Sequence, residues 1–191
     1  MEPVVTRRLR FSTARQVFEA FPPAAGDIVT QPSDEDPLSF LRSLLTGPTP
    51  EDAISFCAYM LPRREAVWWA CQCVRQIENP LTPADEQFVG KVEAWVKDSD
   101  EETRRQVQEA VEASSLDTPA TWIAMGAVWS GGSISGAGNP PVPPPPHATA
   151  QAVRAAVLTS LARVERRERQ NYLNASVMSA LKLIDPDLVK T

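Results

Sequence analysis

The sequence is poor in histidine and cysteine, which excludes several kinds of active site. His147 is the single histidine among 191 residues, and it ends a proline run. Ser-His-Asp and Cys-His catalytic systems therefore have only this one candidate base. The three cysteines, Cys57, Cys71 and Cys73, have no evident fourth ligand for a zinc site. We predict no catalytic residue, no metal site and no cofactor.

The sequence also lacks long hydrophobic runs. No stretch of about 18 apolar residues is present, so no membrane insertion is expected. The basic residues 7–10 are followed by polar residues rather than by the apolar core of an export signal. An odd number of cysteines argues against a secreted disulfide framework. These features predict a cytoplasmic protein.

An excess of positive charge is absent as well. The formal net charge is −5, and carboxylates concentrate in residues 27–52 and 78–117. A domain that binds a polyanion usually carries a net positive charge. We therefore do not expect nucleic acid as a partner, and we interpret the charge runs as solvated helix faces.

No segment shows the sustained alternation of apolar and polar residues that is typical of a strand. Apolar residues recur instead at helical spacing, most clearly in the stretch 61–78, where Val67, Cys71, Val74 and Ile77 share one side. The sequence predicts an all-α fold of about seven to nine helices, with 63–78 as the central packing helix.

Three Thr-Pro pairs predict helix starts, because threonine is a good N-cap and proline suits the first helical position. The pairs are Thr49-Pro50, Thr82-Pro83 and Thr118-Pro119, and their starts are 33 and 36 residues apart. Each interval has room for two helices, predicted at 50–60 and 63–78, then at 83–97 and 101–114. This period favours stacked antiparallel helix hairpins. Alternatively, Thr-Pro is simply a common helix opening.

The predicted domain organisation separates a short arm from one helical domain. Residues 1–32 read as a loosely structured N-terminal arm with a short helix near 13–21. Residues 33–191 form a single helical domain, in which Ser33 and Thr149 are expected N-caps. A further helix is expected at 119–129, and a final one runs from Tyr172 to Ile184.

One long Gly/Pro-rich loop, residues 130–148, interrupts the helical pattern. Its glycine-rich half is flexible by composition and lacks the lysine of a phosphate-binding loop. Its proline-rich half, 140–146, favours polyproline II. Such segments suit partner docking, so we predict Pro143 and Pro144 as partner-binding residues. The alternative is that the loop packs on the domain as a structural strap.

The central helix carries the other predicted partner-binding residues. They are Arg63, Arg64, Glu65, Trp68 and Arg75. Trp68 lies on the more polar face, and Arg64, one turn earlier, is placed to stack on it. Glu65 is placed to form a buried ion pair with a neighbouring arginine, which would lock this helix against others.

The motifs of this helix and of the segment 127–157 carry a family resemblance. Leu61-Pro-Arg-Arg-Glu-Ala-Val-Trp-Trp-Ala-Cys, Ala127-Val-Trp-Ser-Gly-Gly-Ser-Ile, the proline run and Thr149-Ala-Gln-Ala-Val-Arg-Ala-Ala-Val resemble a family of uncharacterised bacterial proteins. Genes of that family tend to lie near type VI secretion components. The resemblance covers roughly residues 38–184 and implies an accessory role in secretion, such as an effector adaptor or chaperone. No functional residue transfers with it.

These observations favour a non-catalytic cytoplasmic factor that binds another protein, with a secretion effector or component as the suspected partner. Two alternatives stay open. One is an immunity protein whose acidic segment 98–117 or 27–52 mimics a polyanion to neutralise a toxin. The other is an enzyme or small-ligand binder. Its pocket would be lined by Trp68, Trp69, Trp122 and Trp129. The sequence leaves the oligomeric state open.

Overall fold

The computed structural model describes residues 9–115, 117–135 and 139–185, and these ranges contain ten α-helices and no strand. The helices are α1 (Ala14–Ala20), α2 (Ala24–Asp27), α3 (Pro37–Thr46), α4 (Asp52–Met60), α5 (Arg63–Ile77), α6 (Pro83–Asp98), α7 (Glu101–Glu112), α8 (Pro119–Val128), α9 (Ala148–Arg163) and α10 (Arg166–Ile184). The all-α prediction is confirmed. The helix beyond the predicted seven to nine is α2, a single turn within a segment expected to be loop.

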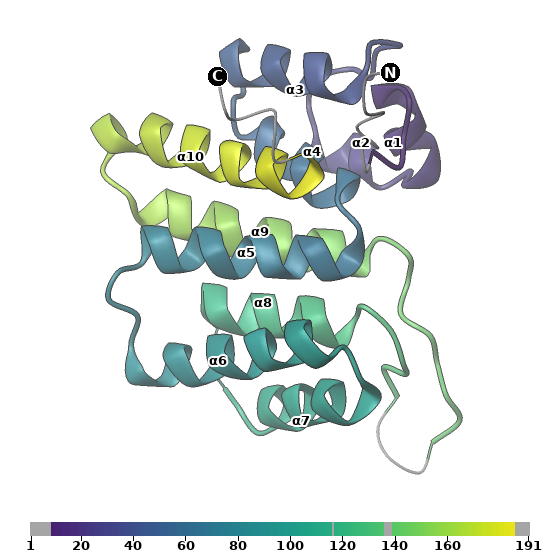
Figure 1. Cartoon of the computed structure of the whole chain (residues 1–191), viewed down its shortest axis with the longest axis vertical. Helices are drawn as coiled ribbons and strands as arrows, with labels where there is room; N and C mark the ends of the chain where they lie inside the picture. Colours follow the sequence, from purple (N-terminus) through teal and green to yellow (C-terminus); the bar gives the residue numbers. More distant parts are fainter. Residues whose placement is uncertain (1–8, 116, 136–138, 186–191) are drawn as a thin grey trace, which may run out of the picture.

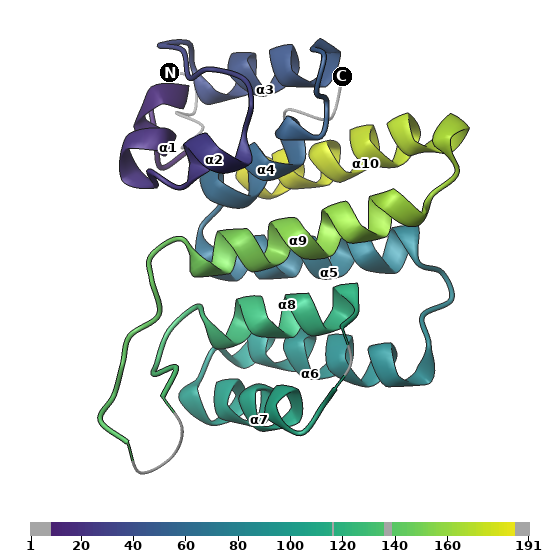
Figure 2. The same cartoon turned by 180° about the vertical axis from the view of Figure 1, so that it is seen from behind.

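The longer helices stack in layers (Figures 1 and 2). The helices α5 and α9 lie side by side in the middle, with α4 and α10 on one side and α8 and α6 on the other. The outermost helix beyond them is α7, which packs on α6 and α8. Both α8 and α5 pack extensively on α9, so the centre of the core is shared between α5 and α9.

Two of the three Thr-Pro starts are confirmed. Thr82 caps α6, since its hydroxyl oxygen accepts from the amide of Asp85 at 3.1 Å. Thr118 begins α8 with a capping box: its hydroxyl accepts from the Thr121 amide at 3.4 Å, and the Thr121 hydroxyl accepts from the Thr118 amide at 2.9 Å. These caps are local, so the sequence pattern was sufficient to find them.

Three predicted caps are displaced. The start of α4 comes at Asp52, three residues after Thr49, whose hydroxyl donates to the Asp52 carboxylate at 2.9 Å. Asp36 rather than Ser33 caps α3, because Pro37 occupies the first helical position. Thr149 lies inside α9 and is buried, and its hydroxyl has no hydrogen-bond partner in the described part of the chain.

The predicted hairpin pairing is only partly correct. The second pair, α6 and α7, packs together, but α4 and α5 share few contacts. Instead α4 packs mainly on α9 and α3. Every residue of α4 is buried, so this helix needs neighbours on all sides, which one hairpin partner cannot supply.

The N-terminal segment is not the loose arm that we predicted, as far as residues 9–32 are concerned. Both α1 and α2 pack beside α4, and Val17 and Phe18 are buried. The ring of Phe18 lies 6.2 Å from that of Phe40 and 6.4 Å from that of Phe56. This aromatic cluster joins α1, α3 and α4 into the common core. Residues 1–8 lie outside the described ranges.

The last two helices are separated by a break at Val164 and Glu165. The final helix begins at Arg166, earlier than predicted. Arg169 stabilises the break, because its Nε donates to the carbonyl of Leu161 at 3.2 Å, near the end of α9. The Leu161 carbonyl also accepts from the Val164 amide at 3.2 Å. Carbonyls in the last turn of a helix lack helical partners, and Nη2 of Arg169 donates to one of them, that of Ala162, at 3.4 Å.

The core is closed around Trp69 and the α8–α9 contact. Trp69 is fully buried, and its indole N–H donates to the carbonyl of Ser176 in α10 at 2.8 Å. A Cβ added at Gly126 would lie 2.9 Å from Cγ1 of Val153, so glycine lets α8 approach α9 closely. Among the described residues, no helix is long and apolar enough to cross a membrane.

Candidate functional site

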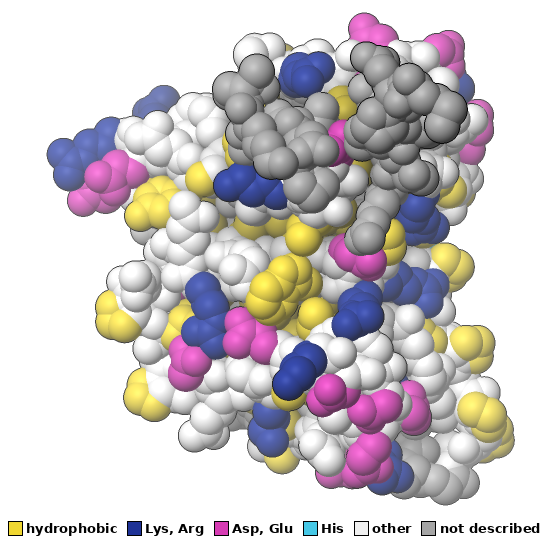
Figure 3. All heavy atoms as spheres, in the orientation of Figure 1, with side chains coloured by type: hydrophobic (Ala, Val, Ile, Leu, Met, Phe, Trp, Pro, Cys, Tyr) yellow, Lys and Arg dark blue, Asp and Glu magenta, His cyan; other side chains and the backbone are white. Residues whose placement is uncertain are grey.

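A groove between α5 and α6 is the main candidate interaction site. It has a volume of about 450 Å³ and is lined by Arg64 and Trp68 of α5 and by Glu93, Val96 and Lys97 of α6. Figure 3 shows hydrophobic side chains at the surface between these helices, with basic and acidic side chains beside them. The groove is therefore apolar at its centre and charged at its edge.

Trp68 differs from its neighbour Trp69 in burial and in the hydrogen bonding of its indole N–H. Trp69 is fully buried and its indole N–H is hydrogen-bonded. Trp68 is half-buried, and its indole N–H has no hydrogen-bond partner among the described residues. A half-exposed indole with a free donor offers both apolar area and a directed hydrogen bond to a ligand.

Arg64 is held at the groove edge by α6. Its Nε donates to the carbonyl of Val96 at 2.6 Å and its Nη2 to that of Lys97 at 3.1 Å. The guanidinium thus satisfies carbonyls in the last turn of α6. No cation–π contact joins Arg64 to Trp68 within the described ranges, so the predicted stacking is wrong. The Arg64 charge has no carboxylate partner there and stays available.

Arg75 lies beside the groove and is tied to two carboxylates. Its guanidinium bonds Glu93 at 2.8 Å through Nε and Glu86 at 2.8 Å through Nη1 and again through Nη2. Hydrogen bonds to Glu86 and Glu93 raise the pKa of Arg75, and the bond from Arg75 lowers the pKa of Glu86. Arg75 therefore links α5 to α6, and its one positive charge is shared between Glu86 and Glu93. Arg64 and Lys97 remain as the uncompensated charges of the groove.

Arg63 contacts the loop 130–148 rather than α6. It is half-buried, and it donates to the carbonyl of Ser130 at 3.0 Å and to that of Pro146 at 3.4 Å. These acceptors lie near the two ends of the loop 130–148. We name this contact the Arg63 clamp. It closes the base of the loop and occupies the side chain in the free protein.

Glu65 is half-buried, and it forms no ion pair with any residue in the described ranges. The predicted buried Arg–Glu pair within 63–65 is therefore wrong, since both arginines donate to backbone carbonyls instead. Arginine has five donors in a fixed fork, which suits it to capping pairs of carbonyls.

The loop is folded onto the domain where it is described. Gly132 has a φ of +63°, and a Cβ there would lie 2.6 Å from the guanidinium of Arg104. Arg104 is buried and donates to the carbonyl of Val128 at 3.0 Å. Of the two predicted prolines, Pro143 is exposed whereas Pro144 is buried. The loop thus combines the strap and the exposed surface that were considered as alternatives.

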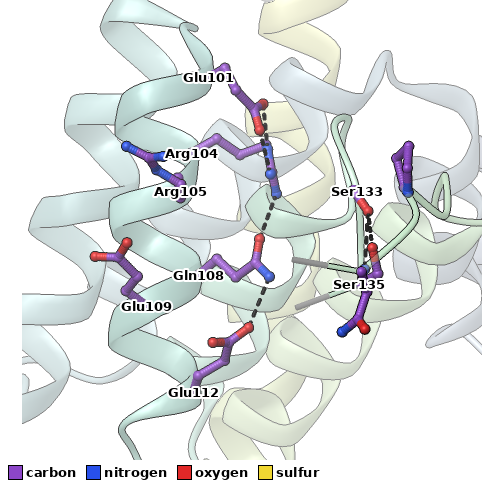
Figure 4. A pocket seen from close by; sticks show the side chains of 10 residues that line it. Glu101, Arg104, Arg105, Gln108, Glu109, Glu112, Ser133 and Ser135 are labelled. Carbon is purple, nitrogen blue, oxygen red and sulfur yellow. Dashed lines mark hydrogen bonds and ion pairs between the residues drawn. The ribbon is translucent and has the colours of Figure 1, made fainter. Parts of the chain in front are cut away.

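A second, polar pocket of about 310 Å³ lies between α7 and this loop (Figure 4). Its wall on α7 is a ladder in which Arg104 bonds Glu101 at 2.6 Å and Gln108 at 3.2 Å. Gln108 in turn donates to Glu112 at 2.8 Å. These side chains satisfy one another, so the pocket presents few free groups to a ligand.

The predicted tryptophan pocket does not form. Trp69 is in the core, and Trp122 donates its indole N–H to Asp117 at 2.9 Å. Trp68 lines the α5–α6 groove, whereas Trp129 follows the end of α8 and packs partly buried against the core. The four tryptophans therefore do not surround a common space.

The cysteines lack the environment of reactive thiols. All three are buried, and burial raises the pKa of Cys57 and of Cys71 and brings the pKa of Cys73 to about 11. A thiol is nucleophilic as its thiolate, so these side chains are suited to packing. Within the described ranges, no group of three or more His, Cys, Asp or Glu side chains is placed to hold a metal ion.

A cluster of titratable side chains, formed by Asp27, Tyr59 and Arg154, was not predicted from the sequence. Tyr59 donates to Asp27, and Arg154 lies 3.5 Å from the same carboxylate and donates to Ser55 at 2.8 Å. Burial, followed by the bond to Asp27, raises the pKa of Tyr59. The cluster connects α2, α4 and α9, whose residues are up to 127 positions apart. No sequence signal brings such distant residues together.

Comparison with known proteins places the chain in a family. The sequence model of DUF6931 matches residues 40–184, which is most of the chain. The chain belongs to DUF6931. That family is described as one of unknown function. No curated protein and no solved structure matches the chain. The family region includes the α5–α6 groove and the loop 130–148, and it begins after α1 and α2.

Proposed function

We propose that this DUF6931 protein is a non-catalytic interaction factor whose α5–α6 groove receives a segment of another protein. The observation that carries the proposal is Trp68, half-buried with a free indole N–H, in a groove that the uncompensated cations Arg64 and Lys97 also line. Tryptophan and arginine are the residue types most enriched among energetically dominant interface positions.

The charges around the groove select the chemistry of the occupant. Two cations, Arg64 and Lys97, line the groove against one carboxylate, Glu93, so the groove presents net positive charge on a chain whose total is −5. The complementary segment carries a large apolar side chain, which covers the Trp68 ring, next to a carboxylate. That carboxylate would lie near Lys97 and Arg64, where charge complementarity favours the correct register.

The resemblance to proteins encoded near type VI secretion genes supports a cytoplasmic adaptor or chaperone role, with a secreted effector as the partner. An adaptor of this kind needs a surface that binds its partner, such as the α5–α6 groove, and no reaction centre. A partner segment that is disordered before binding would lose chain entropy on docking, which suits reversible holding.

The test begins with affinity capture from the native host, followed by purification of the reproducible partner. Its affinity is then measured by calorimetry against the parent chain, Trp68→Ala and Lys97→Glu. Lys91→Glu is the matched control, because Lys91 is exposed on the same helix and does not line the groove. We expect both groove variants to bind at least about tenfold more weakly, which is 1.4 kcal/mol.

Equal affinity of the parent, Trp68→Ala and Lys97→Glu would refute the groove as the binding site. The melting temperature of each variant is measured in parallel, so that a loss of binding is not mistaken for unfolding. Inhibition of an enzymatic activity of the captured partner would favour the immunity alternative over the adaptor.

A further inference from the structure

The proline run of the loop has a defined backbone shape. Residues 140–146 contain six prolines and one valine, and residues 140–145 belong to neither helix nor strand. Each proline fixes its own φ near −65°, and a residue that precedes proline is restricted to extended conformations. Residues 140–145 therefore form a short polyproline II helix, and Pro146 begins the turn that leads into α9.

Polyproline II has three residues per turn, so residues three apart share an edge. One edge consists of Pro140 and Pro143, and a second of Val142 and Pro145; all four are exposed. On the third edge Pro144 is buried. The segment is thus anchored by one edge and presents the other two to solvent.

Hydrogen bonds hold this segment in place from both sides. The amide of Ile134 donates to the carbonyl of Val142 at 2.8 Å, and the hydroxyl of Ser135 donates to that of Pro140 at 2.8 Å. At the far end the Arg63 clamp holds the carbonyl of Pro146. Little further chain ordering is needed for this segment to bind a partner.

The same place gathers exposed apolar side chains. The structure shows four large hydrophobic residues that are exposed in the described ranges: Val29, Ile134, Val142 and Met178. Ile134 and Val142, at 40% and 47% exposure, are joined by the backbone hydrogen bond described above. Pro140 and Pro143 are exposed on either side of Val142, and we call Ile134, Pro140, Val142 and Pro143 the apolar ridge. Exposed apolar patches mark interaction sites.

We infer that the ridge of Pro140, Val142, Pro143 and Ile134 is itself a ligand for an aromatic-lined groove on a second protein, of the kind that recognises polyproline II. Proline rings fit between aromatic side chains, and the carbonyl of Pro143, which accepts no hydrogen bond from the described residues, is left for a donor of the partner. This surface belongs to the loop and does not include the α5–α6 groove. The inference therefore stands independently of the proposed function.

The experiment uses the full chain and three purified probes: an SH3 domain, a WW domain and an EVH1 domain. Binding to each is measured by calorimetry for the parent, for Pro140→Ala/Pro143→Ala, for the control Pro22→Ala and for Trp68→Ala. Pro22 is an exposed proline outside the run. Thermal unfolding of every variant is recorded, and the single variant Pro143→Ala is added in case the double variant is destabilised.

We expect at least one probe to bind the parent saturably, and the double variant to bind it at least about tenfold more weakly. Pro22→Ala and Trp68→Ala should bind that probe like the parent. The inference is overturned if none of the three probes binds saturably, or if the proline variants bind as well as the parent. Loss of probe binding in Trp68→Ala would also overturn it, because the contact would then belong to the groove.

Discussion

The hydroxyl of Thr118 donates a 2.6 Å hydrogen bond to the buried carboxylate of Asp85, and this bond joins the first turns of α6 and α8. Asp52 has a similar arrangement at the start of α4, where it accepts at 2.9 Å from the hydroxyls of both Thr30 and Thr49. In each case, a carboxylate three residues after a threonine ties its own helix start to a distant segment. The Thr-x-x-Asp spacing therefore has a tertiary role.

Asp85→Ala tests this role. The substitution removes the carboxylate of Asp85, which is 5% exposed and accepts from the hydroxyls of Thr82 and Thr118. Thr82 is exposed and Thr118 is half-buried, so what is lost is mainly their hydrogen bonds to a charged acceptor. We expect the free energy of unfolding to fall by about 1.5–3 kcal/mol. Urea denaturation measures it. Asp98→Ala, at an exposed position of the same helix, is the control; equal stability of the two variants would contradict the prediction.

Gly132→Ala tests the anchoring of the loop. The new Cβ would lie 2.6 Å from the Arg104 guanidinium, in a backbone with a φ of +63°. A non-glycine residue in this region costs about 1–3 kcal/mol, and we expect a loss of stability in that range.

The matched control is Gly131→Ala, where the added Cβ meets no atom within 4 Å. We expect hydrogen exchange of the Ile134 amide to become faster in the Gly132 variant and to stay unchanged in the control. Parent-like exchange and stability in Gly132→Ala would show that the loop is not held through Arg104.

The adjacent tryptophans of α5 are expected to respond differently to truncation. Trp69 is fully buried and hydrogen-bonded to α10, so Trp69→Ala should lower the free energy of unfolding by about 3–5 kcal/mol. Trp68 is half-buried in the groove, and Trp68→Ala should lower it by less than about 2 kcal/mol. Denaturant titration measures both. A larger loss for Trp68 would assign that side chain to the core.

Arg75→Gln tests the link between α5 and α6 through its dependence on pH. The bond from Arg75 depresses the pKa of Glu86 below its ordinary value of 4.5. A carboxyl group whose pKa is depressed in the folded state stabilises the fold at pH values above its ordinary pKa. This contribution is lost as the pH falls through the folded-state pKa. We therefore expect Arg75→Gln to be less stable than the parent at neutral pH, and the difference to shrink below about pH 4.5.

Urea denaturation at several pH values measures this difference. Arg105→Gln serves as the control, because the ion pair of Arg105 with Glu102 is about 60% exposed on both sides. Exposed pairs contribute little, so its effect should be small at every pH. A difference between Arg75→Gln and the parent that stays constant with pH would contradict the assignment.

The candidate site was only partly predictable. Trp68 stood out because it lies on the polar side of an otherwise apolar helix. The groove depends on where α6 lies against α5, and the partners of Arg63 and Arg64 are 67 and 32 residues away. The sequence could show that these arginines lie near Trp68, but not that they bind carbonyls of other elements.

By itself, the sequence determined the all-α class, the central helix near 63–77 and the starts at Thr82 and Thr118. Each of these depends on helical periodicity or on a cap whose atoms lie within about four residues. The tertiary structure alone decided that α4 packs on α9, that α1 and α2 join the core and that the described parts of the loop 130–148 lie against the domain. Those outcomes follow from burial and hydrogen bonds between distant segments, which local spacing does not encode.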